Sequence, residues 1–180
     1  MQNFTLNLNA KLQPMHRGEL YEDPLTELLE AQNLGQTVGG GTLLEDNHEV
    51  ANCDVEIELA DGAENVDKLV AIINNFGVPK GSKLLAEGVS IEVGTMEGLA
   101  VYFDGVNLPD EVYKECDINF ALATMNELME GLGRHYSYWT GPTESAIYFY
   151  GTSFEAMKAS IQGFVDEYPL CANARLVRIA

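Results

Sequence analysis

A nine-residue stretch near the N-terminus returns in shortened form about 100 residues later, and this repeat constrains the fold more than any other feature. The first copy is Glu27-Leu-Leu-Glu-Ala-Gln-Asn-Leu-Gly35, and the second is Glu127-Leu-Met-Glu-Gly-Leu-Gly133. In both copies an apolar-faced helix pattern ends at a glycine and runs into strand-like sequence. The segments that flank the two copies correspond in type and order, so the sequence predicts two versions of one unit.

The first half has the pattern strand, helix, strand, strand, helix, strand. The opening strand alternates Phe4, Leu6 and Leu8 with polar residues. The first helix is predicted to begin with Asp23 as its cap and Pro24 at its first position, and to end at Gly35. The other predicted elements are strands 36–44 and 50–59, a helix over 64–76, and an extended segment over 83–93 that bends at Gly88.

The second half repeats this order. It is predicted to hold a strand over 99–104, one long helix over 109–132, strands over 135–139 and 145–150, a helix capped by Ser153, and a closing strand over 174–179. The order is that of the ferredoxin-like βαββαβ fold. We therefore expect an α+β protein of two tandem ferredoxin-like units, residues 1–95 and 96–180. Their antiparallel sheets are expected to be continuous or packed together in one compact body.

A net charge of −18 is the strongest compositional signal. Such a chain repels phosphate backbones, which argues against nucleic-acid binding. No apolar run approaches the roughly 18 residues that a membrane span needs, so we expect a cytoplasmic protein without membrane contact. Cys53, Cys116 and Cys171 are far apart and lack metal-ligand spacing, which predicts buried thiols rather than a disulfide framework or a zinc site. No cofactor motif is present.

One strand of the first half carries a row of acidic side chains. Asp54, Glu56 and Glu58 alternate with apolar residues and should lie on the sheet face without helices, beside polar residues of the neighbouring strands, namely Thr5, Asn7, Asn9, Ser90 and Glu92. Such carboxylates could hold calcium or magnesium. Neighbours about 7 Å apart in water repel each other by only about 0.6 kcal/mol, however, which does not demand a metal. A solvated face available to a basic partner is the preferred interpretation.

The corresponding face of the second half is predicted to be rich in tyrosine. Tyr102, Tyr148 and Tyr150 should point away from the helices, and Tyr136 and Tyr138 should join them if His135, Ser137 and Trp139 lie on the other face. The placement resembles the base-stacking surface of RNA-recognition motifs, but the Lys/Arg-rich consensus of that family is missing. The preferred interpretation is that the other unit or a second copy covers these rings, with their hydroxyls at the rim. A ligand or partner surface is the alternative.

Two further segments could contribute to a pocket. Gly39-Gly40-Gly41-Thr42 lacks the lysine of a phosphate-binding loop and precedes no helix, which favours a bulge or a close backbone approach. His16, Arg17 and Glu19 form the one cluster suited to acid–base chemistry or anion binding, although a loop before a helix is often polar. His135, Trp139 and Cys116 show no triad spacing.

The sequence contains no catalytic signature, and we expect a non-enzymatic protein-binding or regulatory module of the inhibitor, immunity or adaptor type. Its partner would be another protein, and a basic one fits the charge; a homodimer is also compatible with the tyrosine-rich face. The alternative is a small-molecule-binding protein or enzyme with a pocket between the two units, near Gly40 and the segment that contains His16, Arg17 and Glu19.

Overall fold

The computed structural model describes residues 1–180, which divide into two compact units. The first comprises residues 1–46 and 50–96 together with Ala180, and the second comprises residues 97–179 together with the short segment Asn47–Glu49. Each unit has a sheet of its own. The two sheets therefore share no strand.

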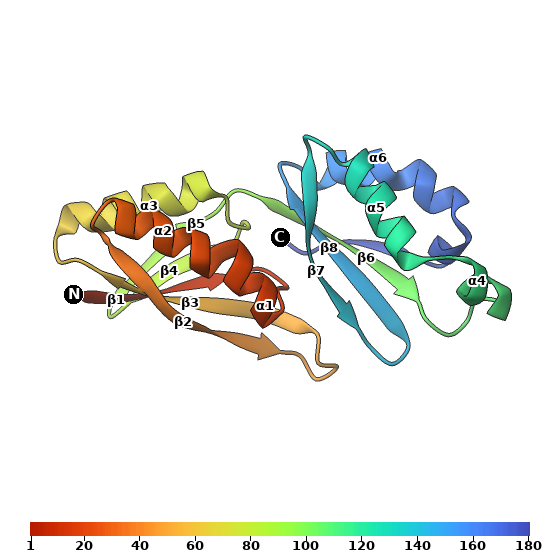
Figure 1. Cartoon of the computed structure of the whole chain (residues 1–180), viewed down its shortest axis with the longest axis horizontal. Coiled ribbons are helices and arrows are strands. Elements are labelled where there is room, and N and C mark those ends of the chain that lie inside the picture. The colour runs from red at the N-terminus through yellow and green to blue at the C-terminus, as the bar shows by residue number, and fades with distance from the viewer. The chain divides into compact units, whose positions relative to one another are not determined.

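The first unit is an antiparallel sheet with helices on one face. Its strands are β1 (Gln2–Leu8), β2 (Gly35–Leu44), β3 (Val50–Leu59), β4 (Ser82–Ala86) and β5 (Val89–Val93), in the spatial order β2-β3-β1-β4-β5. Figure 1 shows helices α2 (Asp23–Ala31) and α3 (Ala63–Phe76) on the same face of this sheet. Without β5, this strand order is that of a ferredoxin-like unit.

Alternation along the strands builds the core of this unit. In β3, Cys53, Val55, Ile57 and Leu59 are at most 1% exposed, whereas the acidic residues between them remain partly exposed. The helices contribute further buried apolar side chains, Leu25, Leu29, Leu69 and Ile73. The predicted division of this strand into an apolar and an acidic face is confirmed.

The helical segment before β2 differs from the prediction. It begins at Pro14 rather than beside Asp23, because α1 (Pro14–Arg17) continues through a π-helical turn (Gly18–Glu22) into α2. It ends at Ala31, the nearby Asn33 adopts a left-handed φ of 52°, and Gly35 already belongs to β2. Asparagine tolerates this conformation better than most residues, so it takes the place that glycine was expected to fill.

The predicted extended segment 83–93 is a hairpin. Strands β4 and β5 pair antiparallel through Lys83 and Glu92 and through Ala86 and Val89, and Gly88 adopts a φ of 69° in the turn between them. The expected bend at Gly88 is thus a complete reversal of the chain, which adds an edge strand to the sheet.

The second unit repeats the topology without an extra strand. It contains β6 (Glu97–Asp104), β7 (Gly133–Thr140), β8 (Glu144–Gly151) and β9 (Arg175–Arg178), in the order β7-β8-β6-β9 with antiparallel pairing throughout. Two helices, α5 (Ile118–Leu128) and α6 (Phe154–Glu167), cover one face. Ser153 caps α6 as predicted, since its side chain accepts a hydrogen bond from the backbone N–H of Ala156. The chain therefore consists of two tandem ferredoxin-like units.

The single helix predicted over 109–132 is wrong. The segment contains α4 (Asp110–Glu115) and α5, separated by Cys116 and Asp117 in extended conformation. Asp117 caps α5, because its carboxylate accepts a 2.8 Å hydrogen bond from the backbone N–H of Asn119. A side chain that competes for backbone donors in this way starts a new helix instead of continuing the old one.

The packed interior of the second unit lies between this sheet and its helices. It includes Leu99, Val101 and Phe103 of β6, Ile147 and Phe149 of β8, and Met157 and Ile161 of α6. None of the helices in either unit combines the length and the apolar character that a membrane crossing requires.

Candidate functional site

The acidic row (Asp54, Glu56 and Glu58) lies on the face of the first sheet that has no helices. Each carboxylate is tied to a neutral side chain on an adjacent strand. Asp54 accepts a 2.7 Å hydrogen bond from Asn7, and Glu56 accepts one of 3.0 Å from Thr5. Glu58 accepts a longer bond of 3.4 Å from Gln36. Because β3 pairs with β1 on one side and β2 on the other, the row is held from both sides.

These contacts orient the acidic row without neutralising it, because none of the three partners carries a charge. A carboxylate elsewhere in the same sheet does have a charged partner, since Lys83 of β4 forms a 3.2 Å ion pair with Glu92 of β5. No group of three or more His, Cys, Asp or Glu side chains in the chain is arranged to hold a metal ion. The row can therefore act chemically as a fixed line of negative charge.

Four of the five predicted face tyrosines lie on the helix-free face of the second sheet and are buried. The exposed fraction is 9% for Tyr102, 8% for Tyr136, and 1% each for Tyr148 and Tyr150. Tyr136 packs edge-on against Tyr150 with ring centroids 5.2 Å apart. Arg175 lies over the ring of Tyr102, 4.6 Å from its centroid. These rings are not an open stacking platform.

A buried carboxylate joins two of these tyrosines. Glu49, which belongs to the second unit, is 7% exposed and accepts hydrogen bonds from the hydroxyls of Tyr102 at 2.5 Å and Tyr148 at 2.7 Å. Burial, and then the bond to this carboxylate, raises the pKa of both tyrosines above the ordinary value of 10.0. The prediction that the hydroxyls lie at a rim is wrong for Tyr102 and Tyr148, because both hydroxyls bind a buried carboxylate. The sequence gives no sign that Glu49 would be buried.

Tyr138 is not part of this face. A bulge in β7 shifts the register between His135 and Ser137, so that Ser137 pairs with Tyr148 and Tyr138 pairs with the core residue Ile147. His135, Ser137 and Trp139 were expected on the helix-covered face. Only His135 lies there, where its ring packs edge-on against Phe149. The extra residue at the bulge reverses the alternation that the prediction assumed.

Arg17 and Gly40, two of the proposed pocket residues, lie together, but they form a structural joint. The Arg17 guanidinium is buried and donates to the carbonyl oxygen of Gly41 at 2.7 Å, the hydroxyl of Thr42 at 2.8 Å and the carboxylate of Glu22 at 2.5 Å. A Cβ at Gly40 would overlap the carbonyl oxygen of Asp54 and come within 2.9 Å of Arg17 Nε. The predicted close approach at the glycines is confirmed.

The two other residues of that predicted pocket, His16 and Glu19, are more exposed than Arg17. Glu19 is exposed and His16 is partly exposed, whereas Arg17 is 8% exposed. Arg17 already has three acceptors, including a carboxylate of opposite charge. The joint therefore attaches the first helix to β2 rather than presenting a free cation.

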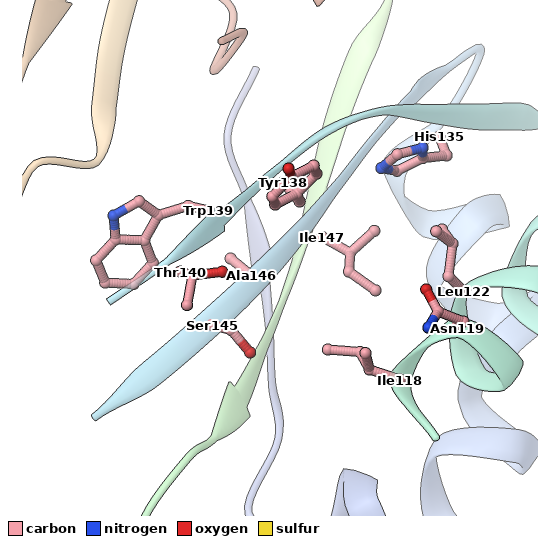
Figure 2. Close-up of a pocket in the computed structure, with 10 residues that line it drawn as sticks. All are labelled: Ile118, Asn119, Leu122, His135, Tyr138, Trp139, Thr140, Ser145, Ala146 and Ile147. Carbon is pink, nitrogen blue, oxygen red and sulfur yellow. The ribbon is translucent and has the colours of Figure 1, made fainter. Parts of the chain in front are cut away.

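A different cavity, not predicted from the sequence, lies in the second unit between α5 and the edge strand β7. Its volume is about 370 Å³. Figure 2 shows Ile118 and Leu122 of α5 facing Ile147 of β8, with His135 and Tyr138 on the β7 side and the Trp139 ring directed away. The remaining residues around it are Asn119, Thr140, Ser145 and Ala146. An apolar floor with a few polar groups is typical of small-molecule sites.

The three cysteines are free thiols. Burial raises the pKa of Cys53 to about 12 and that of Cys171 to about 11, which leaves both protonated at neutral pH. Neither thiol lines the cavity beside α5. These two residues therefore act as small apolar side chains of the core.

The sequence matches no protein-family model, and it matches none of the curated proteins. Among solved structures, it is similar to the first two RRM domains of the yeast poly(U)-binding protein Pub1, with 13% identity, a TM-score of 0.25, and coverage of 100% of this chain and 99% of that one. It is also similar to a candidate monooxygenase from Lactobacillus acidophilus NCFM, with 14% identity, a TM-score of 0.32, and coverage of 100% and 95%. Because both TM-scores are low, the ferredoxin-like fold is assigned from the strand order of each unit.

Proposed function

We propose that this protein is a non-enzymatic binding module that recognises a basic protein partner through the acidic row of its first unit. One observation carries the proposal: Asp54, Glu56 and Glu58 are partly exposed, are held in place by neutral neighbours, and are compensated by no cation. Fixed carboxylates favour a partner that supplies lysine or arginine in matching positions.

The surrounding charge supports the same partner. Residues 1–97 contain 17 acidic and 5 basic residues, and two of the acidic ones, Glu49 and Glu97, belong to the second unit. The excess of negative charge in the first unit attracts cations. The acidic row is distinguished from this background by its rigidity. Thr5 and Asn7 lie directly opposite Glu56 and Asp54 on the paired strand, which reduces the side-chain entropy that binding would otherwise cost.

The experiment is affinity capture from extract of the cells that make the protein. Three baits are compared: the wild-type chain, a row variant (Asp54→Asn, Glu56→Gln and Glu58→Gln), and a control variant (Glu27→Gln, Glu30→Gln and Asp67→Asn). The control removes the same charge from exposed helix positions. Partners of the acidic row are the proteins that the wild type and the control retain and the row variant loses.

The size of the effect follows from ordinary surface electrostatics. If each carboxylate contributes about 0.5–1 kcal/mol, the row variant should bind about 10- to 100-fold more weakly. Retention by wild type should also fall as salt rises from about 0.05 to 0.5 M, because exposed charges are screened. Equal retention by the row and control variants would show that only the overall charge matters.

A further inference from the structure

We infer that the cavity beside α5 is a binding site for a small uncharged molecule with an apolar body of about two fused rings and one hydrogen-bonding group. The site lies wholly in the second unit and is independent of the acidic row. The inference depends on three observations: the charge of the lining, the size of the cavity, and the polar groups at its margin.

The lining contains no charged side chain. Asp, Glu, Lys and Arg make up 21% of the sequence, yet none of the ten residues around this cavity is one of them. Charged residues line a neighbouring hollow instead, where Lys114 and Asp117 lie near Ile118 and Ser145. An ionised ligand in the neutral cavity would lose hydration without gaining a counter-charge, so an uncharged ligand is favoured.

The volume sets the size of the ligand. An engineered apolar cavity of about 150 Å³ binds benzene, and drug-sized sites begin at about 300 Å³. At about 370 Å³ the present cavity has room for a two-ring compound. Ile118 and Leu122 on one side and Ile147 on the other supply apolar surfaces for both faces of such a ring system.

Polar groups at the margin select the ligand's functional group. The hydroxyls of Thr140 and Ser145 make no hydrogen bond within the protein, and Asn119 uses its amide nitrogen to donate to Asp117 at 3.1 Å, which leaves its amide oxygen as an acceptor. These groups can exchange hydrogen bonds with a hydroxyl or an amide. A ligand hydroxyl placed there would keep its hydrogen bonds when it leaves water.

The test uses three probes with the same ring body: 2-naphthol, which is neutral at pH 7, 2-naphthoate, which is an anion, and 2-naphthylmethylamine, which is a cation. Binding to the full chain is followed by methyl and amide NMR shifts and by calorimetry. We expect 2-naphthol to bind at least about tenfold more tightly than either ion. Its shifts should centre on Ile118, Leu122 and Ile147.

Matched variants locate the site. Leu122→Trp fills the cavity and should abolish 2-naphthol binding, whereas Leu128→Trp makes the same change at a residue of α5 that is 44% exposed and lies outside the lining, and should leave binding unchanged. Ser145→Leu fills the cavity from β8 and serves if Leu122→Trp does not fold. Equal binding of the three probes, shifts centred elsewhere, or full binding by a folded cavity-filling variant would overturn the inference.

Discussion

Tyr136 and Tyr138 lie on opposite faces of the second sheet, although a single residue separates them in β7. The Tyr136 ring packs against Tyr150 on the helix-free face, whereas Tyr138 pairs with Ile147 and lines the cavity beside α5. The bulge between His135 and Ser137 produces this reversal. It gives the cavity an aromatic wall that regular alternation would have placed on the other face.

The bulge predicts different chemical reactivity for these two tyrosines. Tyr138 is 46% exposed and Tyr136 is 8% exposed, so tetranitromethane should nitrate Tyr138 several-fold faster in the native protein. Peptide mass spectrometry over a time course measures both rates. Denatured protein is the control, because both tyrosines should then react alike. Nitration of Tyr136 as fast as Tyr138 in the folded chain would contradict the register.

The joint around Arg17 predicts that alanine is destabilising at Gly40 but is tolerated at the adjacent Gly41. Gly40→Ala places a methyl group against the carbonyl oxygen of Asp54 and should cost about 1–3 kcal/mol of unfolding free energy. Gly41→Ala meets no atom within 4 Å and should leave stability within about 0.5 kcal/mol of wild type. Urea unfolding measures both variants. Equal losses would show that Gly40 is not a point of close approach.

Asp104 predicts a pH effect at the end of β6. The backbone N–H groups of Val106 and Asn107 donate to its carboxylate at 3.0 and 2.9 Å, and these bonds lower its pKa from 3.8 to about 2. Because the folded-state pKa is the lower one, the stabilisation is complete above about pH 4 and is lost as pH falls toward 2. Carboxyl ¹³C NMR should therefore give a midpoint near 2.

Two variants distinguish the effect of the Asp104 pKa from the general loss of stability of the protein in acid. Asn173 donates to Asp104 Oδ2 at 3.2 Å and has a φ of 66°, so Asn173→Gly removes the donor without straining the backbone. Its Asp104 midpoint should lie between about 2 and 3.8. Asp104→Asn should show a weaker fall in stability between pH 4 and 2 than wild type. A wild-type midpoint near 3.8 would refute the proposed set of hydrogen bonds.

The parts of the fold that could be predicted depend on regular alternation and local caps. Val55 and Ile57 are buried and Glu56 faces outward because β3 has no bulge between them, and Ser153 caps α6 with a side chain three residues from its donor. The order of the elements then determined the two ferredoxin-like units. The acidic row was predictable for the same reason, since its position depends only on the period of a strand.

The parts that could not be predicted depend on long-range contacts. The bulge in β7 has no glycine or proline to mark it, and Glu49 is buried by tyrosines about 50 and 100 residues away. The cavity is lined by Tyr138, which follows the bulge, and by Ile118 and Asn119, which begin the helix that Asp117 caps. Asp117 belongs to the residue types favoured at a helix N-cap, and this local signal was outweighed by the continuous helical pattern around it.

The most direct measurement of the central claim is the dissociation constant of a captured partner for the wild-type chain, the row variant and the charge-matched control, each at about 0.05 and 0.5 M salt. Fixed carboxylates at Asp54, Glu56 and Glu58 predict that the row variant binds about 10- to 100-fold more weakly than the control at low salt, and that this difference shrinks at high salt. Equal affinities for the row variant and the control at low salt would contradict a role for the acidic row.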